Sequence, residues 1–277
     1  MSDSRVIWYA HRKLTDPIAI VGFPSVGLVS SIVTSFIARD LKMPVVAGIT
    51  APELPPYALI QGGVPYPQIR VYAVKAAKKK AAPIAGKTAA TEEPAAKDVP
   101  AKSKKAAKKS PSALGRDLVV VTSEIAPRPE QTYNLMIMLM DTLKQLGVSQ
   151  CVCLEGIPRF ENGSNATMLA VGSNPNMRKL AKQLGINYMD EGLVRGTTGV
   201  LLYASTAEKT NLLTLLCPAN PQLPDPRAAV TLLDPLSKLV PGLNLDTTPL
   251  FKEAEEIEQR MKMEQKQANT NTQQIYG

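Results

Sequence analysis

The stretch Ile18–Leu41, IAIVGFPSVGLVSSIVTSFIARDL, decides the fold of this 277-residue chain. Four apolar residues form a short run that ends at Gly22, and Pro24 and Gly27 mark a turn. Apolar residues then recur at the spacing of one helical face: Val29, Ile32, Val33, Phe36 and Ile37. A buried strand, a tight turn and an amphipathic helix begin a β-α-β unit, and such units build parallel sheets covered by helices.

The turn Gly22–Gly27 has the glycine spacing of a phosphate-binding loop, and helix N-termini attract anions. However, Leu28 and Val29 stand where that motif needs lysine and serine or threonine. We therefore interpret the turn as structural.

The same alternation of strand and helix continues along the chain. We expect strands at residues 5–10, 43–49, 58–61, 68–74, 117–122, 150–154, 186–189 and 211–217. We expect helices at 130–146, from the cap Asn174 to Gly185, at 199–207 and from Asp225 onwards. The strands at 58–61 and 68–74 read as a hairpin joined by GGVPYP. The pattern predicts a three-layer α/β/α sandwich with a mostly parallel sheet.

The formal net charge of +8 comes from one segment. Residues 75–115 contain eleven lysines and three acidic residues, whereas the rest of the chain has 21 basic and 21 acidic residues. This segment of Lys, Ala and Pro has no aromatic residue, so we predict a disordered insertion. We interpret it as a solvated loop; the alternative is non-specific binding of nucleic acid or another polyanion through Lys75 to Lys109.

Several classes of protein are not indicated. No run of about 18 apolar residues predicts a membrane span, and the N-terminus lacks the apolar core of a signal peptide. Three cysteines suggest a reducing cytoplasm. Cys151 and Cys153 share a face of a predicted strand without further metal ligands, and His11 is the only histidine. We expect no metal and no cofactor.

The chain ends in a predicted helix and a polar tail. Residues 1–74 and 116–246 form the expected α/β domain. A helix follows over residues 247–265, with an apolar stripe at Leu250, Ala254, Ile257 and Met261. Residues 266–277 read as a flexible tail that closes with Ile275-Tyr276-Gly277.

Short motifs in a fixed order give the chain a resemblance to the PAC2 family of proteasome assembly chaperones, in its archaeal form. They are GFPSVG (22–27), ELPP (53–56), DLVVVT (117–122), LEGI (154–157), GLVRGTTGVLL (192–202) and PDPRAA (224–229). The resemblance covers about residues 5–74 and 116–260, and the Lys-rich insertion departs from it. It implies a core similar to purine nucleoside phosphorylases, a homo-oligomer, and a chaperone rather than an enzyme.

The resemblance also directs attention to the terminal residues. Ile275-Tyr276-Gly277 resembles the hydrophobic-tyrosine-any motif that partners insert between the α-subunits of the 20S proteasome. We therefore expect these residues to be the partner-binding site. The rival hypothesis is an enzyme of the nucleoside phosphorylase type, although no phosphate-binding or base-binding set is visible. The acids Glu53, Glu124, Glu155 and Glu191 have plausible structural roles.

Overall fold

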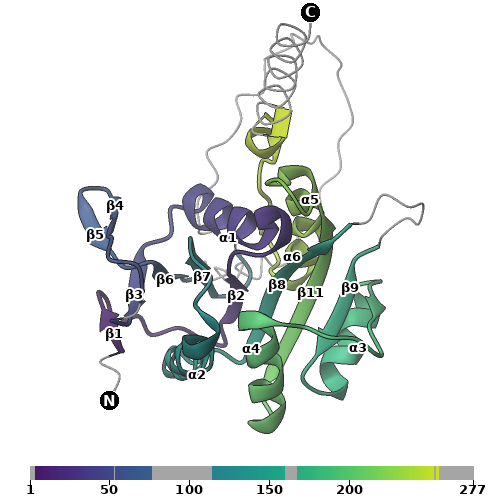
Figure 1. Ribbon diagram of the computed structural model, residues 1–277, viewed down its shortest axis with the longest axis horizontal. Coiled ribbons are helices and arrows are strands. Elements are labelled where there is room, and N and C mark those ends of the chain that lie inside the picture. Colours follow the sequence, from purple (N-terminus) through teal and green to yellow (C-terminus); the bar gives the residue numbers. More distant parts are fainter. Residues whose placement is uncertain (1–3, 53, 77–113, 160–166, 253, 256–277) are drawn as a thin grey trace, which may run out of the picture.

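The computed structural model describes residues 4–52, 54–76, 114–159, 167–252 and 254–255. They form a nine-stranded mixed sheet between two layers of helices (Figure 1). The strand order is β1-β3-β6-β7-β2-β8-β11-β9-β10, and β4 and β5 form a separate two-stranded sheet. This arrangement confirms the predicted α/β/α fold class.

The elements alternate along the chain much as the sequence indicates. The strands are β1 Arg5–Trp8, β2 Ile18–Gly22, β3 Val45–Thr50, β4 Leu59–Gln61, β5 Val64–Tyr66, β6 Ile69–Val74, β7 Leu118–Ser123, β8 Gln150–Pro158, β9 Leu169–Gly172, β10 Asn187–Tyr188 and β11 Asn211–Ala219. The helices are η1 Val26–Leu28, α1 Val29–Asp40, α2 Pro129–Gln145, α3 Pro175–Gln183, α4 Gly196–Ala207, α5 Pro226–Thr231 and α6 Leu233–Leu239.

Four neighbouring strands, β7, β2, β8 and β11, run parallel at the centre of the sheet. Every residue of β2 and β7 is buried, as expected for central strands covered on both faces. β6, β3 and β1 join one side in antiparallel pairing, and β9 joins the other side antiparallel to β11. The parallel centre places the carboxyl ends of β2, β7 and β8 at one edge.

Alternate residues of the strands point into two separate cores. Ile18 and Ile20 of β2 pack with α1, α3, α5 and α6, whereas Ala19 and Val21 pack with α2 and α4. This alternation follows from the two-residue period of a strand. It explains why the central strands carry unbroken apolar runs.

The hairpin prediction was wrong in its pairing. β4 pairs with β5, so residues 64–66, which the sequence assigned to the connecting turn, form a strand. Gly62 and Gly63 make the turn with φ of +57° and +77°, the left-handed region that glycine tolerates. β6 instead enters the main sheet between β3 and β7. Figure 1 shows the β4–β5 hairpin projecting from the side of the sheet that ends in β1.

The described ends of the Lys-rich segment are tied together. Val74 of β6 pairs with Leu118 of β7, and the buried carboxylate of Asp117 accepts hydrogen bonds from the backbone N–H groups of Ala76 and Thr15, each at 2.7 Å. Residues 77–113, on which the predictions of disorder and of polyanion binding depend, lie outside the described residues.

The beginning of the predicted C-terminal helix belongs to the body. Residues 248–252 and 254–255 are helical. Leu250 and Ala254 are buried, and the guanidinium of Arg227 in α5 lies 6.0 Å from the ring centroid of Phe251. The stripe residues Ile257 and Met261 lie outside the described part, so the helix bounds and the division into domain, insertion and tail stay predictions. No helix in the described ranges is long and apolar enough to cross a membrane.

Candidate functional site

Residues of α1 and β8 contact the turn that follows β2. The hydroxyl of Ser25 accepts a hydrogen bond from the backbone N–H of Gly156 in β8 (2.9 Å) and lies 2.5 Å from the hydroxyl of Ser30 in α1. A Cβ atom at Gly156 would lie 1.9 Å from the carbonyl oxygen of Val26, and one at Gly22 would lie 2.5 Å from that of Ser30. Both glycines are therefore required for the close packing of η1, α1 and the two strands, which supports the structural interpretation of this turn.

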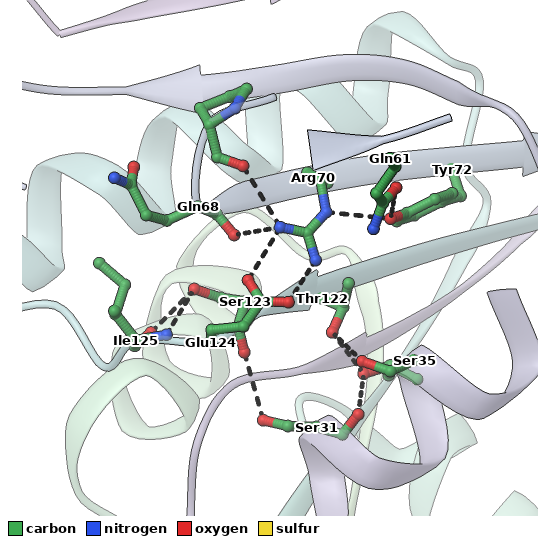
Figure 2. A network of polar contacts seen from close by, with 12 residues as sticks. Ser31, Ser35, Gln61, Gln68, Arg70, Tyr72, Thr122, Ser123, Glu124 and Ile125 are labelled. Atoms are coloured by element: carbon green, nitrogen blue, oxygen red, sulfur yellow. Dashed lines mark hydrogen bonds and ion pairs between the residues drawn. The ribbon is translucent and has the colours of Figure 1, made fainter. Parts of the chain in front are cut away.

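A second set of polar contacts lies at the edge formed by the carboxyl ends of the parallel strands. The buried side chain of Arg70 is at its centre, and we call this set the Arg70 network (Figure 2). The side chain of Arg70 is only 2% exposed, and its two terminal nitrogens bind both carboxylate oxygens of Glu124, which follows β7. Its Nε donates to the hydroxyl of Tyr72 (2.9 Å), which donates in turn to the side-chain oxygen of Gln61 in the hairpin (2.9 Å). The Arg70 network thus joins β6, the end of β7 and the hairpin.

Helix α1 is tied to β7 by hydroxyl groups beside this network. The hydroxyl of Thr122 lies 3.0 Å from that of Thr34 and 3.2 Å from that of Ser35, and Ser31 donates to the carbonyl of Ser123 (3.3 Å; Figure 2). These contacts use the polar groups of the α1 face that meets the strand. We find a positioning role for them and no reactive group among them.

The hydrogen-bond partners of Arg70 keep its guanidinium in the charged form. Burial alone lowers the pKa of Arg70, but hydrogen bonds to Glu124 and Tyr72 more than offset this and raise it above its ordinary value. A guanidinium that stays charged and bonds a carboxylate through two parallel contacts is a strong structural link.

Glu155 is the second carboxylate at this edge, on the other side of β2. It accepts a hydrogen bond of 2.5 Å from the hydroxyl of Thr198 in the first turn of α4, and that hydroxyl lies 3.4 Å from the sulfur of Cys153. Burial raises the pKa of Glu155 to about 7, with the Thr198 hydrogen bond acting in the opposite direction. Burial likewise raises the pKa of Cys153 to about 12, so its thiol stays protonated and is a weak nucleophile.

The chemistry available at these sites is limited. Glu155 has a raised pKa but its hydrogen bond goes to the hydroxyl of Thr198, and Cys153 beside it is not activated. His11 is exposed, and its ring stacks on Trp8 with the two centroids 5.7 Å apart. Within the described residues no group of His, Cys, Asp and Glu is arranged to bind a metal ion.

A sequence model of the PAC2 family matches residues 19–265. The chain belongs to the PAC2 family. An uncharacterized protein of Methanocaldococcus jannaschii is 25% identical over 253 residues, covering 91% of this chain and 87% of the relative.

Two solved structures share the fold of this PAC2 protein. PbaA of Pyrococcus furiosus, described as an archaeal homolog of proteasome-assembly chaperone, has a TM-score of 0.73 at 22% identity, covering 98% of this chain and 95% of PbaA. PbaB of the same organism, described as an archaeal proteasome activator, has a TM-score of 0.73 at 19% identity, covering 96% of this chain and all of PbaB.

The predicted docking residues of this PAC2 protein, Ile275, Tyr276 and Gly277, lie outside the described residues, as does Glu53. Of the other acids considered from sequence, Glu124 and Glu155 have the partners given above, and Glu191 is exposed.

Sequence reasoning missed the Arg70 network. The available signal was an arginine inside the otherwise apolar run IRVYAV, because a charge in a buried strand requires a partner.

Proposed function

We propose that this PAC2 protein is a proteasome assembly chaperone or activator-like protein, without enzymatic activity, that docks on the α-ring of the 20S proteasome. The docking residues are Ile275, Tyr276 and Gly277. The observation that carries the proposal is this hydrophobic-tyrosine-any motif at the end of a PAC2 chain. The descriptions of the structural neighbours PbaA and PbaB as a chaperone homolog and a proteasome activator support it.

Each docking residue suits a pocket between two ring subunits. Ile275 enters an apolar groove, and Tyr276 buries its ring while its hydroxyl makes a hydrogen bond. The free carboxylate of Gly277 pairs with a lysine of the pocket, a form of terminal carboxylate capture. Residues 266–277 span at most about 40 Å when extended, which lets the motif reach a ring while the body stays outside it.

One such motif binds weakly, so the proposal includes a homo-oligomer. Several tails on one oligomer act at high effective concentration, and avidity exceeds single-site affinity by about 100-fold or more where the spacing matches. The oligomer works in the cytoplasm, where the proteasome is assembled. The raised pKa of the Cys153 thiol, which leaves it a weak nucleophile, is in keeping with a body that binds rather than catalyses.

The test measures capture of 20S α-subunits by the full chain and by tail variants. We expect deletion of residues 275–277, Tyr276→Ala, and extension of the chain by one residue beyond Gly277 each to abolish capture. The matched control is Tyr203→Ala, which removes a half-exposed tyrosine from α4. Unchanged capture by the deletion variant would refute the proposal. Peptide hydrolysis by 20S particles with and without the protein then separates an activator from an assembly chaperone.

The concentration of charge in residues 75–115 favours a second candidate function, binding of polyanions through Lys75 to Lys109. Lysine contacts to phosphate release counterions, so such binding falls steeply as salt rises. We expect a salt-sensitive shift of duplex DNA that disappears when residues 77–113 are replaced by a short Gly-Ser linker. A full chain that gives no shift at low salt would remove this candidate.

A further inference from the structure

A cavity of about 520 Å³ lies on the α1 face of the sheet, between the second half of α1 and the β4–β5 hairpin (Figure 1). We call it the α1 pocket, because α1 and the residues directly after it supply one wall. The Arg70 network supplies the floor, and every residue that lines the pocket belongs to the described part of the chain. The volume is within the range of sites for small molecules.

The floor of the α1 pocket is polar and held in place before any ligand arrives. Arg70 and Tyr72 are 2% and 5% exposed, and the hydroxyl of Tyr72 joins Arg70 to Gln61 (Figure 2). The oxygen of Gln61 accepts from Tyr72, which leaves its amide nitrogen with N–H groups to donate to a ligand. The Glu124 side chain is 39% exposed, and its oxygens have lone pairs beyond those that Arg70 uses. The floor can therefore both donate to and accept from a hydroxylated ligand.

Two exposed cations, Arg39 and Lys42, line the wall above this floor. Together with Arg70 they give the lining three positive charges against the single carboxylate of Glu124. The carboxyl end of α1 does not occupy these cations, because the carbonyls of residues 37–39 already accept hydrogen bonds from the backbone N–H groups of residues 41–43. Among the described residues, none forms an ion pair or a hydrogen bond with either side chain.

The position of the pocket agrees with a rule for α/β sheets. α1 follows β2 and α2 follows the neighbouring strand β7, yet the two helices pack on opposite faces of the sheet. Ligands of such sheets bind at the carboxyl ends of the strands where the connections change face in this way. Glu124 is the first residue after β7 and lines the α1 pocket, so the pocket reaches this position.

These groups define the ligand chemistry. A phosphate monoester carries a charge of about −1.5 to −2 at neutral pH, which balances the excess positive charge of the lining. A guanidinium binds two phosphate oxygens at once, and an ammonium adds a compact positive charge. The hydroxyl groups of a sugar donate to a carboxylate such as Glu124 and accept from an amide such as that of Gln61.

We propose that the α1 pocket binds a small sugar phosphate. Arg39 and Lys42 bind the phosphate group, and Glu124 and Gln61 bind the hydroxyl groups of the sugar. The preformed floor keeps the ordering cost of binding low. This binding is separate from docking by the C-terminal residues and does not depend on it.

The test titrates the full chain with ribose 5-phosphate by calorimetry, at neutral pH and low ionic strength. Ribose and inorganic phosphate are the two reference ligands. We expect saturable binding of ribose 5-phosphate, weaker binding of inorganic phosphate and no binding of ribose. Arg39→Gln and Lys42→Gly each remove one cation and should each weaken the binding of ribose 5-phosphate about 5- to 20-fold. Added salt should weaken it as well, because the cations are exposed.

Lys42→Gly also separates loss of the ligand from loss of the fold. Lys42 has a φ of +48° in the turn that ends α1, a conformation that glycine adopts more easily. The variant should therefore melt about 2 °C above the parent while it binds more weakly. Lys209→Gly is the matched control, since Lys209 is an exposed lysine with a φ of +57° and the same backbone hydrogen bonds after α4, outside the pocket. It should gain the same stability and bind like the parent.

Four results would each overturn the proposal. The first is no binding of ribose 5-phosphate up to about 5 mM, and the second is equal binding of ribose. The third is inorganic phosphate binding as tightly as ribose 5-phosphate, because the sugar would then contribute nothing. The fourth is an affinity that is unchanged in the Arg39→Gln and Lys42→Gly variants, or lowered equally in Lys209→Gly.

Discussion

Replacing Glu155 by glutamine (E155Q) should make the protein more stable at alkaline pH and remove part of the pH dependence of its stability. Glu155 accepts a hydrogen bond from Thr198, and burial raises its pKa from 4.5 to about 7. The glutamine side chain keeps the shape of the protonated acid and an oxygen that accepts the Thr198 hydrogen bond. The variant therefore isolates the cost of the buried charge.

The free energy of unfolding changes with pH because the folded state holds the Glu155 proton more tightly than the unfolded state does. Below pH 4.5 the carboxyl is protonated in the folded and unfolded states, so it does not affect the free energy of unfolding. Between pH 4.5 and 7 the folded state keeps the proton and the unfolded state releases it, so stability falls as pH rises. The full difference corresponds to about 3 kcal/mol, and because the side chain keeps some contact with solvent we expect about 1–2 kcal/mol.

The assay is urea unfolding at pH 5 and pH 8, followed by circular dichroism. We expect E155Q to lose about 1–2 kcal/mol less than the parent between these two values. Glu191→Gln, an exposed carboxylate in the loop before α4, is the matched control and should follow the parent. Parallel pH profiles for E155Q and the parent would refute the raised pKa of the half-buried Glu155.

Three further variants test the packing of the body. Gly156→Ala places a Cβ 1.9 Å from the backbone oxygen of Val26. It should lower the free energy of unfolding by about 3 kcal/mol, measured by urea unfolding, or prevent folding. A stability close to that of the parent would contradict the close approach of Gly156 and Val26. Glu124→Gln leaves the guanidinium of Arg70 buried without its carboxylate and should cost about 2 kcal/mol in the same assay, which an added Arg70→Met should partly restore. Asn174→Ala removes the cap whose side-chain oxygen accepts two backbone N–H groups of α3, and a melting curve should show a loss of about 1 kcal/mol; an unchanged curve would count against the cap.

Periodic patterns predicted most of the fold. The apolar runs in β2 and β7 identified the centre of the sheet, and the cap Asn174 with Pro175 marked the start of α3. These signals are local, because each depends on neighbours a few residues apart. Pairing between distant strands leaves no such local signal. Residues 64–66 were therefore assigned to the connecting stretch GGVPYP, although a two-stranded ribbon accepts a proline such as Pro65 at its edge.

The contacts that the sequence did not predict at the site join residues that lie far apart along the chain. Arg70 and Glu124 lie 54 residues apart, and nothing in the sequence near either residue identifies the other. Thr198 and Glu155 are similarly separated by 43 residues. Short β9 was missed because its four residues, LAVG, are too few to show a period. The candidate docking residues depend on sequence and family resemblance alone.

The contacts of Asp117 allow the length of the segment between β6 and β7 to change. Because the β6–β7 ladder and the Asp117 carboxylate already join the chain on both sides of residues 77–113, the body does not need that segment to bring its own strands together. The entropy of closing a loop grows only with the logarithm of its length, so doubling or halving the segment changes stability by about 0.6 kcal/mol. A tag or sensor domain inserted at this position should therefore leave the sandwich intact.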